Sequence, residues 1–549
     1  MASGRDWGRW TALAGFVCAM AGLAAQPAPR APATVTFLSS ADGSQQPYAL
    51  YLPRSFRPDV RHPLVISLHG EDVPAQVNLF QLFGMRPPSG GPGFGDLGSM
   101  PFPDVDFIVA CPLARGAMGY QGIAEQDVYD VLADVERRYP VDEDRVYLTG
   151  ISMGGGGALW LALTRPDVWA AVAPLCAATV PGSEELASNA GNLPIRLFHG
   201  EADAVVPAQS SRAWQKRLLD AGAPADYFEY AGARHNAWDF AYRNHGVFDW
   251  FASQRRVKSP ERVRFVTRSY RYSSAYWVRL DGLTPGELAS IDARRTGRNE
   301  ARVETRGLEG FSFVGGALDL PAVVAIDGEI LRVKAGSPLS FEKAAGHWRQ
   351  GAFQPGGKRS GAEGPMLAAL SSRHIYVYGT AGDPSPQELD ARRRAAQRAA
   401  AWSAPAARVI FAPPVKADSA VSAADIAESN LVLFGTRYSN SLIARFAPDL
   451  PMELQPGAAD YGLAFIVPLG GRYILVTSGR DLWSGAPSDG GGYRFAPWPY
   501  RLLSTFGDFV LFKGSLDDVV SEGRFDGNWK LPPDAPATTP ATGTVTIRQ

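Results

Sequence analysis

The feature that most constrains the fold is a regular alternation of apolar runs and helical segments between residues 33 and 256. The apolar runs are short and rich in aliphatic residues, as in strands buried on both faces of a parallel sheet. They lie at 33–37, 48–52, 64–68, 107–111, 146–148, 170–173, 195–198 and 227–230, with helical spacing at 127–139, 155–163 and 247–256. Such alternation predicts an α/β fold with a doubly wound sheet over residues 33–256.

The rest of the chain changes character twice. Short strands near turn residues, without helical spacing between them, predict a β-rich accessory module over residues 262–350. From 362 to 530 strands and helices alternate again, which predicts a second, small α/β domain of flavodoxin-like style. Two of its strands end in Gly-Thr, at 379–380 and 435–436, which we interpret as structural turns, with phosphate binding as the alternative. Residues 531–549 are rich in Pro, Ala and Thr and are predicted to form a disordered tail.

The first 25 residues have the pattern of a secretory signal peptide. Arg5 and Arg9 precede an apolar run over residues 10–25 that ends in small residues. The run is shorter than the roughly 20 residues that span a bilayer, so an uncleaved anchor is the less favoured alternative. We therefore expect a secreted or periplasmic protein that begins near Gln26 and has no membrane attachment after cleavage.

The charge balance and the motif content exclude several function classes. The chain has 54 Lys and Arg against 55 Asp and Glu, a formal net charge of -1, so nothing electrostatic favours nucleic acid as a partner. The sequence contains neither Gly-x-Gly-x-x-Gly nor a P-loop, and no His or Cys pair has the spacing of metal ligands. We expect no cofactor and no metal.

A Gly-x-Ser-x-Gly motif follows one of the predicted strands and opens a predicted helix. It reads Gly150-Ile151-Ser152-Met153-Gly154, after the strand at 146–148. In this strand–turn–helix setting the serine occupies a sharply turned backbone, and side chains at the glycine positions would collide with the neighbouring strand and helix. The motif predicts Ser152 as a nucleophile.

A serine hydroxyl needs a base and an acid, and on this fold they follow it in the order acid, then His. Asp203 lies in the loop after the strand at 195–198, and His235 in the loop after the last strand. We expect His235 to accept the Ser152 proton and Asp203 to orient the imidazole. Glu201 is the nearest rival acid, and His245, in a helical aromatic stretch, is the nearest rival base.

The negative charge that forms during acyl transfer needs two preset N–H donors. One is expected from the backbone of Met153, directly after the nucleophile. The other is expected from the loop after the strand at 64–68, where Glu71 is our choice and Gly70 the alternative.

Together these segments resemble secreted α/β-hydrolases. The segments are residues 145–155, His199-Gly200-Glu201-Ala202-Asp203 with Val206-Pro207, and His235 with Trp238. They are most similar to prolyl-oligopeptidase-like hydrolases and to feruloyl and acetylxylan esterases of carbohydrate esterase family one. The resemblance covers residues 33–256 and implies the strand order 1-2-4-3-5-6-7-8. Asp127 also matches a helix start in that group, and we interpret it as a helix cap.

The resemblance implies a secreted serine hydrolase that cleaves carboxylic esters through a Ser-His-Asp triad and an acyl-enzyme. Acyl or feruloyl esters of polysaccharides are the candidate substrates. A serine peptidase of the prolyl-oligopeptidase type is the alternative, and a binding protein on an inactive hydrolase scaffold is a third hypothesis. The chain departs from the group at residues 76–100, where we expect a loop over the active-site mouth with Phe80, Phe83 and Phe94 available to line a pocket. A disordered surface loop is the alternative for this stretch. The regions after residue 262 are candidates to hold a polymer or to pack on that mouth.

Overall fold

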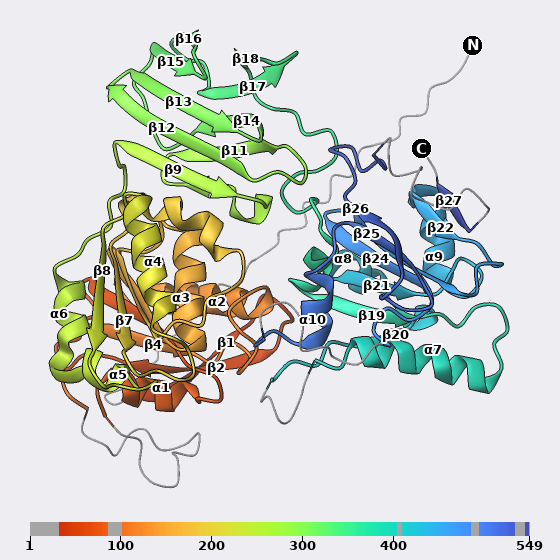
Figure 1. The fold of residues 1–549 in the computed structure, drawn as a ribbon, viewed down its shortest axis with the longest axis horizontal. Coiled ribbons are helices and arrows are strands. Elements are labelled where there is room, and N and C mark those ends of the chain that lie inside the picture. Colours follow the sequence, from red (N-terminus) through yellow and green to blue (C-terminus); the bar gives the residue numbers. More distant parts are fainter. Residues whose placement is uncertain (1–31, 86–101, 403–408, 485–493, 533–543, 548–549) are drawn as a thin grey trace, which may run out of the picture.

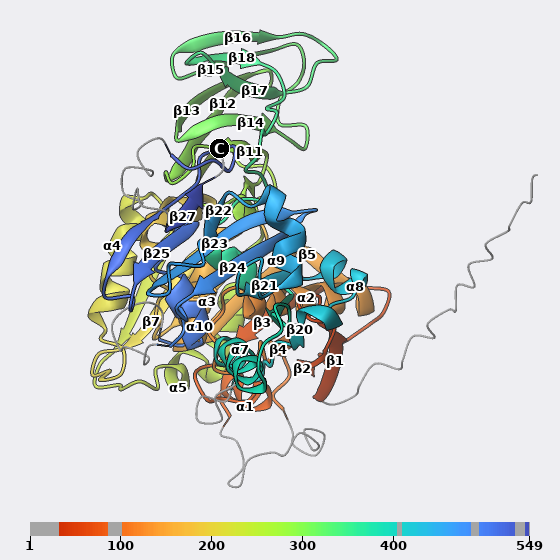
Figure 2. The same cartoon turned by 90° about the vertical axis from the view of Figure 1, so that its right-hand side faces the viewer.

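The structure is a computed structural model that describes residues 32–85, 102–402, 409–484, 494–532 and 544–547. The predicted signal peptide lies outside these ranges. Three regions follow one another along the chain: an α/β region, a β-sandwich and a second α/β region (Figure 1). Figure 2 shows the sandwich above the other two, which lie against each other. Within the described ranges, no helix has both the length and the apolar character needed to cross a bilayer.

The first region is an eight-stranded sheet with helices on both faces (Figure 1). Its strand order, β1-β2-β4-β3-β5-β6-β7-β8, is the order that the resemblance implies. β1 and β2 form an antiparallel hairpin, β2 pairs antiparallel with β4, and the other neighbours are parallel. The strands are β1 Ala33–Leu38, β2 Gln45–Tyr51, β3 His62–Leu68, β4 Ile108–Pro112, β5 Val141–Ile151, β6 Ala171–Leu175, β7 Ile195–Gly200 and β8 Ala225–Tyr230.

Each face of this sheet has its own core. Helices α2 (Ile123–Arg138), α3 (Met153–Thr164) and α4 (Gln209–Asp220) pack on one face, with the 3-10 segment η1 (Ser183–Asn192) beside them. Helices α1 (Ala75–Leu82), α5 (Trp238–Ala241) and α6 (Gly246–Ala252) pack on the other, next to η2 (Arg243–His245). Because parallel strands are buried on both faces, their sequences are nearly all apolar, which is why the sequence pattern located them.

The second region is a sandwich of two five-stranded sheets around one core. The sheet orders are β10-β11-β14-β17-β18 and β16-β15-β13-β12-β9. Alternate residues along each strand face the core, as the pleat of a strand dictates. The elements are β9 Arg262–Thr267, η3 Tyr270–Tyr272, β10 Ser274–Ala275, β11 Val278–Leu283, β12 Ala289–Gly297, β13 Glu300–Arg306, β14 Leu308–Phe313, β15 Ala322–Ile326, β16 Glu329–Val333, β17 Ser340–Ala344 and β18 His347–Gln350.

The third region contains a seven-stranded mixed sheet in the order β20-β19-β21-β24-β23-β25-β26. The strands are β19 His374–Tyr378, β20 Val415–Ala417, β21 Asn430–Phe434, β22 Met452–Leu454, β23 Tyr461–Leu469, β24 Arg472–Gly479, β25 Phe509–Lys513, β26 Val519–Gly523 and β27 Val545–Ile547. The helices are η4 Met366–Leu370, α7 Pro386–Ala399, η6 Asp418–Ala420, α8 Ala423–Glu428, α9 Ser441–Phe446, η7 Ala447–Asp449 and α10 Trp498–Leu503.

The flavodoxin-like prediction needs correction in this third region. The parallel part begins in the expected way, with β19 between β20 and β21. β23 and β24, however, are joined by the tight turn Gly470-Gly471 and pair antiparallel, and β25 and β26 continue antiparallel. A two-residue turn permits only an antiparallel pair, because a parallel pair needs a crossover of a dozen residues or more.

Three further predictions are wrong in part. The tail is not wholly disordered, since Val545–Ile547 forms β27 and pairs with β22. Phe80 and Phe83 do not line a pocket: α1 carries Phe80, Phe83 follows it, and both are buried in the core between the sheet and α6. Phe94 lies outside the described residues. Asp127 is not a helix cap, because it is the fifth residue of α2 and binds Arg115 in the interior.

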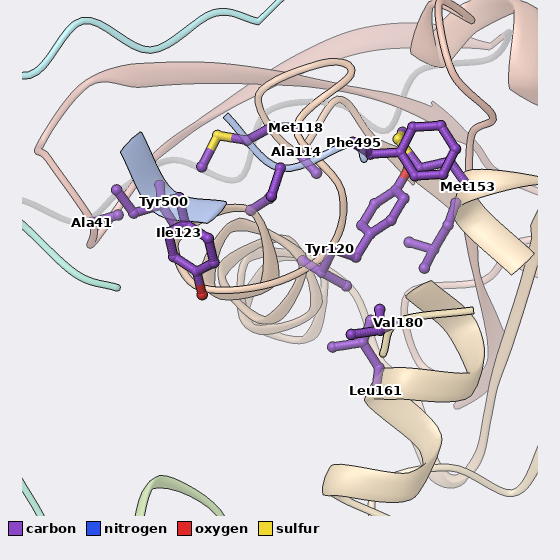
Figure 3. Packing of buried hydrophobic residues seen from close by; sticks show 14 of the residues in the cluster. Ala41, Ala114, Met118, Tyr120, Ile123, Met153, Leu161, Val180, Phe495 and Tyr500 are labelled. Atoms are coloured by element: carbon purple, nitrogen blue, oxygen red, sulfur yellow. The ribbon is translucent and has the colours of Figure 1, made fainter. Parts of the chain in front are cut away.

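One continuous apolar core joins the first region to the third. Met118, Tyr120 and Ile123 of the first region lie in the same buried cluster as Phe495 and Tyr500 of the third (Figure 3). The docking extends to the segment at 409–411. It makes an isolated bridge and a backbone hydrogen bond to the loop after β4.

Candidate active site

Ser152 stands at the tip of β5, where the strand turns directly into α3. Its backbone is in a strained conformation, with φ 55° and ψ -115°. Its N–H donates to the Leu175 carbonyl over 2.9 Å, and its own carbonyl accepts from Gly156 at 3.1 Å and Ala178 at 3.1 Å. These bonds hold a backbone conformation that L-residues rarely adopt. The side chain is thereby placed above the carboxyl edge of the sheet.

The two glycines of the motif are required because a side chain at either position would collide with neighbouring atoms. A Cβ at Gly150 would overlap the backbone of Gly154 and lie 2.9 Å from the Leu68 Cβ. A Cβ at Gly154 would overlap the carbonyl groups of Leu68 and His69. The collisions expected from the sequence are therefore present on both sides of Ser152.

The structure brings the three predicted side chains into a continuous hydrogen-bonded row. The Ser152 Oγ lies 2.9 Å from His235 Nε2, and His235 Nδ1 lies 2.7 Å from Asp203 Oδ2. Ser152 follows β5, Asp203 follows β7 and His235 follows β8, so all three come from carboxyl ends of parallel strands. Loops at this edge of an open sheet meet on one side of the molecule.

Asp203 is held as a carboxylate. Burial opposes its ionisation, but the hydrogen bond with His235 and those from the Val205 and Val206 N–H groups outweigh burial and keep the pKa of Asp203 below its usual value. One oxygen accepts both backbone bonds, which leaves the other for the imidazole. The ring of Trp238 packs edge-on against the His235 ring at 5.6 Å and completes its surroundings.

A buried group behind the acid supports it. His199 Nε2 lies 3.2 Å from Asp203 Oδ2 and 2.9 Å from the Val206 carbonyl, and Nδ1 lies 2.7 Å from Ser211 Oγ. Within the described part of the chain, Cys176, His199 and Asp203 are the one group of three metal-type donors that lie within 4.8 Å of one another. Burial raises the pKa of the Cys176 thiol to about 12, and the Asp203 charge adds to this.

The rival residues lie elsewhere. Glu201 is exposed, and its carboxylate accepts the Gly232 N–H at 2.9 Å in the loop that carries His235. His245 precedes α6 and packs edge-on against Phe248 at 6.3 Å. The row that contains Ser152 is formed by Asp203 and His235, not by these two residues.

The segments expected to carry the oxyanion donors flank Ser152. Met153 is the first residue of α3, so its N–H belongs to the first turn, where the helix dipole favours negative charge. On the other side, a Cβ at Gly70 would lie 3.6 Å from the Ser152 Cβ, which puts the Gly70-Glu71 loop beside Ser152. His69 fixes this loop, since its Nδ1 lies 2.7 Å from the Gly70 carbonyl and its Nε2 2.9 Å from the Leu113 carbonyl.

Two neighbours of this site were missed by the sequence analysis. Arg494 Nη2 lies 3.5 Å from Glu71 Oε2, and Phe495 lies in the same buried cluster as Met153 (Figure 3). Both come from the third region, more than 300 residues further along the chain. Contacts over such separations leave no local signal in the sequence.

Comparison with known proteins gives a match within the first region. Residues 119–253, which include Ser152, Asp203 and His235, match the model of the dienelactone hydrolase family. No curated protein matches the chain.

Solved structures that are similar include several hydrolases. A thermostable esterase is 25% identical with a TM-score of 0.34, over 41% of this chain and 63% of its own, so the match spans under two thirds of that protein. A fluorophosphonate-binding serine hydrolase of Staphylococcus aureus is 17% identical with a TM-score of 0.31, over 41% and 98%. A ferulic acid esterase of Anaeromyces mucronatus, solved with ferulic acid, is 15% identical with a TM-score of 0.30, over 42% and 93%.

The sheet order and the sharply turned Gly-x-Ser-x-Gly segment agree with the family match, and the resemblance seen in the sequence is confirmed. Residues 33–256 have the strand order of an α/β-hydrolase fold, and residues 119–253 within them match the dienelactone hydrolase family model.

Proposed function

We propose that the protein is a serine hydrolase that cleaves carboxylic esters. The observation that carries the proposal is the row Ser152–His235–Asp203, with heavy-atom distances of 2.9 Å and 2.7 Å, at the strained turn between β5 and α3. Distances of this size let a proton pass from the hydroxyl to the imidazole without rearrangement. Acyl or feruloyl groups on a polysaccharide are the proposed substrates.

The proposed reaction has two halves. Ser152 Oγ attacks the ester carbonyl while its proton passes to His235 Nε2, and the backbone N–H groups of Met153 and Glu71 bind the carbonyl oxygen as it gains negative charge. The C–O bond to the alcohol then breaks, the alcohol takes the proton from His235, and an acyl-enzyme remains. Water, deprotonated by His235, attacks the acyl group, which releases the acid and returns the proton to Ser152.

The test is turnover of matched ester and amide substrates by the mature protein. We expect hydrolysis of short p-nitrophenyl esters and methyl ferulate, and none of a Pro-containing peptide amide. S152A is expected to lower kcat by a factor of about a thousand or more, since such residues act as a unit. Turnover of the peptide but not of the esters would favour the peptidase alternative, and ester turnover unchanged in S152A would exclude the proposed mechanism.

The rival residues supply matched controls. D203N and H235A are expected to lower kcat by about three orders of magnitude or more. E201Q and H245A change the two rival residues, and we expect both to retain hydrolysis within about twofold. S253A, on the exposed end of α6, controls for the loss of a serine hydroxyl.

We also propose that the protein is exported. Support comes from residues 1–25, where Arg5 and Arg9 precede an apolar run that ends in small residues. Expression of the full chain followed by N-terminal sequencing of the exported protein should give Gln26 as the first residue. Retention of Met1 or recovery only inside the cell would contradict the proposal.

A further inference from the structure

The third region reaches the active site through two consecutive residues, Arg494 and Phe495. The Arg494 guanidinium pairs with Glu71, whose backbone is the expected second oxyanion donor. Both side chains are partly open to solvent, with 61% of Arg494 and 48% of Glu71 exposed. The pair therefore spans the rim of the site and joins the loop after β3 to a segment 423 residues away in the chain.

Phe495 belongs to the same buried cluster as Met153, the other expected donor. It is buried, and Figure 3 labels it in one close-up with Met153 and Tyr120, which belong to the same cluster. Tyr120 in turn donates from its hydroxyl to the His69 carbonyl over 3.0 Å, one residue before Gly70. Phe495 thus shares one buried cluster with the first residue of α3 and with the tyrosine that bonds to the loop before Gly70.

These two residues are themselves held firmly. The Arg494 guanidinium lies 4.4 Å from the centre of the Phe495 ring, so the two side chains stack. Three residues further on, α10 begins, and its Tyr500 is so close to the start of α2 that a Cβ at Gly122 would lie 3.0 Å from the tyrosine ring. The segment therefore sits against the hydrolase domain at both of its ends.

We propose that Arg494 and Phe495 are positioning residues for the oxyanion hole, so that the third region forms part of the active site. The physical reason is that N–H donors stabilise a developing oxyanion only when they are held in place before the reaction. A displacement of about 1 Å in a reacting group can cost about a hundredfold in rate. Arg494 restrains the Glu71 segment through charge, and Phe495 restrains the Met153 segment as part of the same buried cluster. The proposal rests on the proposed ester hydrolysis.

The first test compares R494Q and F495A with wild type in the full-length protein. R494Q is expected to lower kcat about threefold to fivefold and F495A about tenfold or more, with KM within about twofold, because the lost interaction acts in the transition state. R480Q is the matched control, since Arg480 forms a similarly exposed pair with Asp460 at 2.9 Å elsewhere in the third region. R480Q should leave kcat unchanged.

A stability measurement and two further variants distinguish a positioning role from a general loss of structure. Because the Arg494–Glu71 pair is exposed, R494Q should keep the wild-type melting temperature while its kcat falls. The charge-swapped variant E71R/R494E should recover at least half of the kcat that R494Q loses. F495L, which keeps an apolar side chain, should lie between wild type and F495A.

The second test does not depend on activity. Hydrogen–deuterium exchange at the amides of residues 70–72 and 153–155 should be at least twofold faster in R494Q and F495L than in wild type and R480Q. Normal exchange together with normal kcat in both variants would overturn the inference. If wild type itself hydrolyses no ester, the proposed function fails, and the exchange measurement still decides whether residues 494–495 position these segments.

Discussion

At the residue scale, the buried Arg115 links segments that lie far apart in the chain. Arg115 has a positive φ of 64° and a side chain only 1% exposed, and it binds Asp127 at 2.6 Å and Asp42 at 2.6 Å. Burial raises the pKa of Asp127 although the Arg115 charge opposes this. The Arg115 carbonyl accepts from Ile410, and the guanidinium faces the Phe411 ring at 5.5 Å. Arg115 therefore contacts the turn between β1 and β2, helix α2 and the third region.

We expect D127A to lower the free energy of unfolding by about 3–5 kcal/mol, because removal of one partner leaves the Arg115 charge buried without full compensation. Chemical denaturation measures the loss. D130A, one turn along α2 and hydrogen-bonded to the exposed Ser40 and the partly buried Gln126, should cost under about 1 kcal/mol. Equal losses in the two variants would show that burial of the Arg115–Asp127 pair does not make its loss more costly.

At the element scale, local rules explain most starts and ends. Helix α3 begins at the strained serine and has four glycines in its first turn and a half, which its close packing requires: a Cβ at Gly156 would overlap the Ala178 carbonyl. Helix α7 begins instead with a capping box, in which Ser385 and Glu388 satisfy each other's backbone N–H groups. The start of α3 packs closely against neighbouring backbone and therefore needs glycines. The start of α7 is exposed, and side chains there bind the free backbone N–H groups.

For α7 we expect S385A to reduce the free energy of unfolding by about 1 kcal/mol, since the backbone N–H of Glu388 loses its acceptor. Thermal or chemical denaturation of the two proteins gives the difference. S385D keeps an acceptor and should behave like wild type. A loss of the same size in S385D would point to another cause than capping.

At the scale of the whole molecule, the three regions meet at a buried polar junction. The Glu363 carboxylate accepts from Ser269 Oγ at 3.0 Å and from the Tyr270 and Arg271 N–H groups at 2.5 Å and 3.0 Å. Arg271 then donates to the Gly122 carbonyl at 3.1 Å, and Tyr272 to Glu125 at 2.6 Å. The β-sandwich is thus bonded to both α/β regions at once.

This junction predicts a pH dependence of stability. Burial raises the pKa of Glu363 from 4.5 to about 7, against the hydrogen bonds that oppose the rise. Between these values the folded protein binds more protons than the unfolded chain, so the free energy of unfolding falls as pH rises from about 4.5 to about 7 and is level above. The fall from this group is about 3 kcal/mol. Chemical denaturation at several pH values gives the free energy of unfolding of each protein. Between pH 4.5 and 7 this free energy should fall with pH more steeply in wild type than in E363Q, and above pH 7 the two should depend on pH in the same way. E300Q, at an exposed glutamate, should behave like wild type.

The shared core predicts that the hydrolase domain does not stand alone. In a chain that ends at residue 256, Met118, Tyr120 and Ile123 would lose the cover of Phe495 and Tyr500. We expect this truncated protein to be largely insoluble, or to bind a hydrophobic dye if soluble, since exposed apolar patches of this kind promote association. Soluble, fully active material from the truncated chain would contradict both this expectation and the role of residues 494–495.

The amino-acid sequence alone determined the hydrolase sheet and the row of side chains at its edge. Each strand is an apolar run between turns, and Ser152, Asp203 and His235 each stand just after such a run, so their meeting follows once parallel strands share an edge. The tertiary structure alone decided that Phe80 enters a core, that Asp127 meets Arg115 and that Phe495 joins the buried cluster that contains Met153. The physical reason is that strand and helix patterns are local, whereas these contacts depend on which surfaces of distant segments fit together.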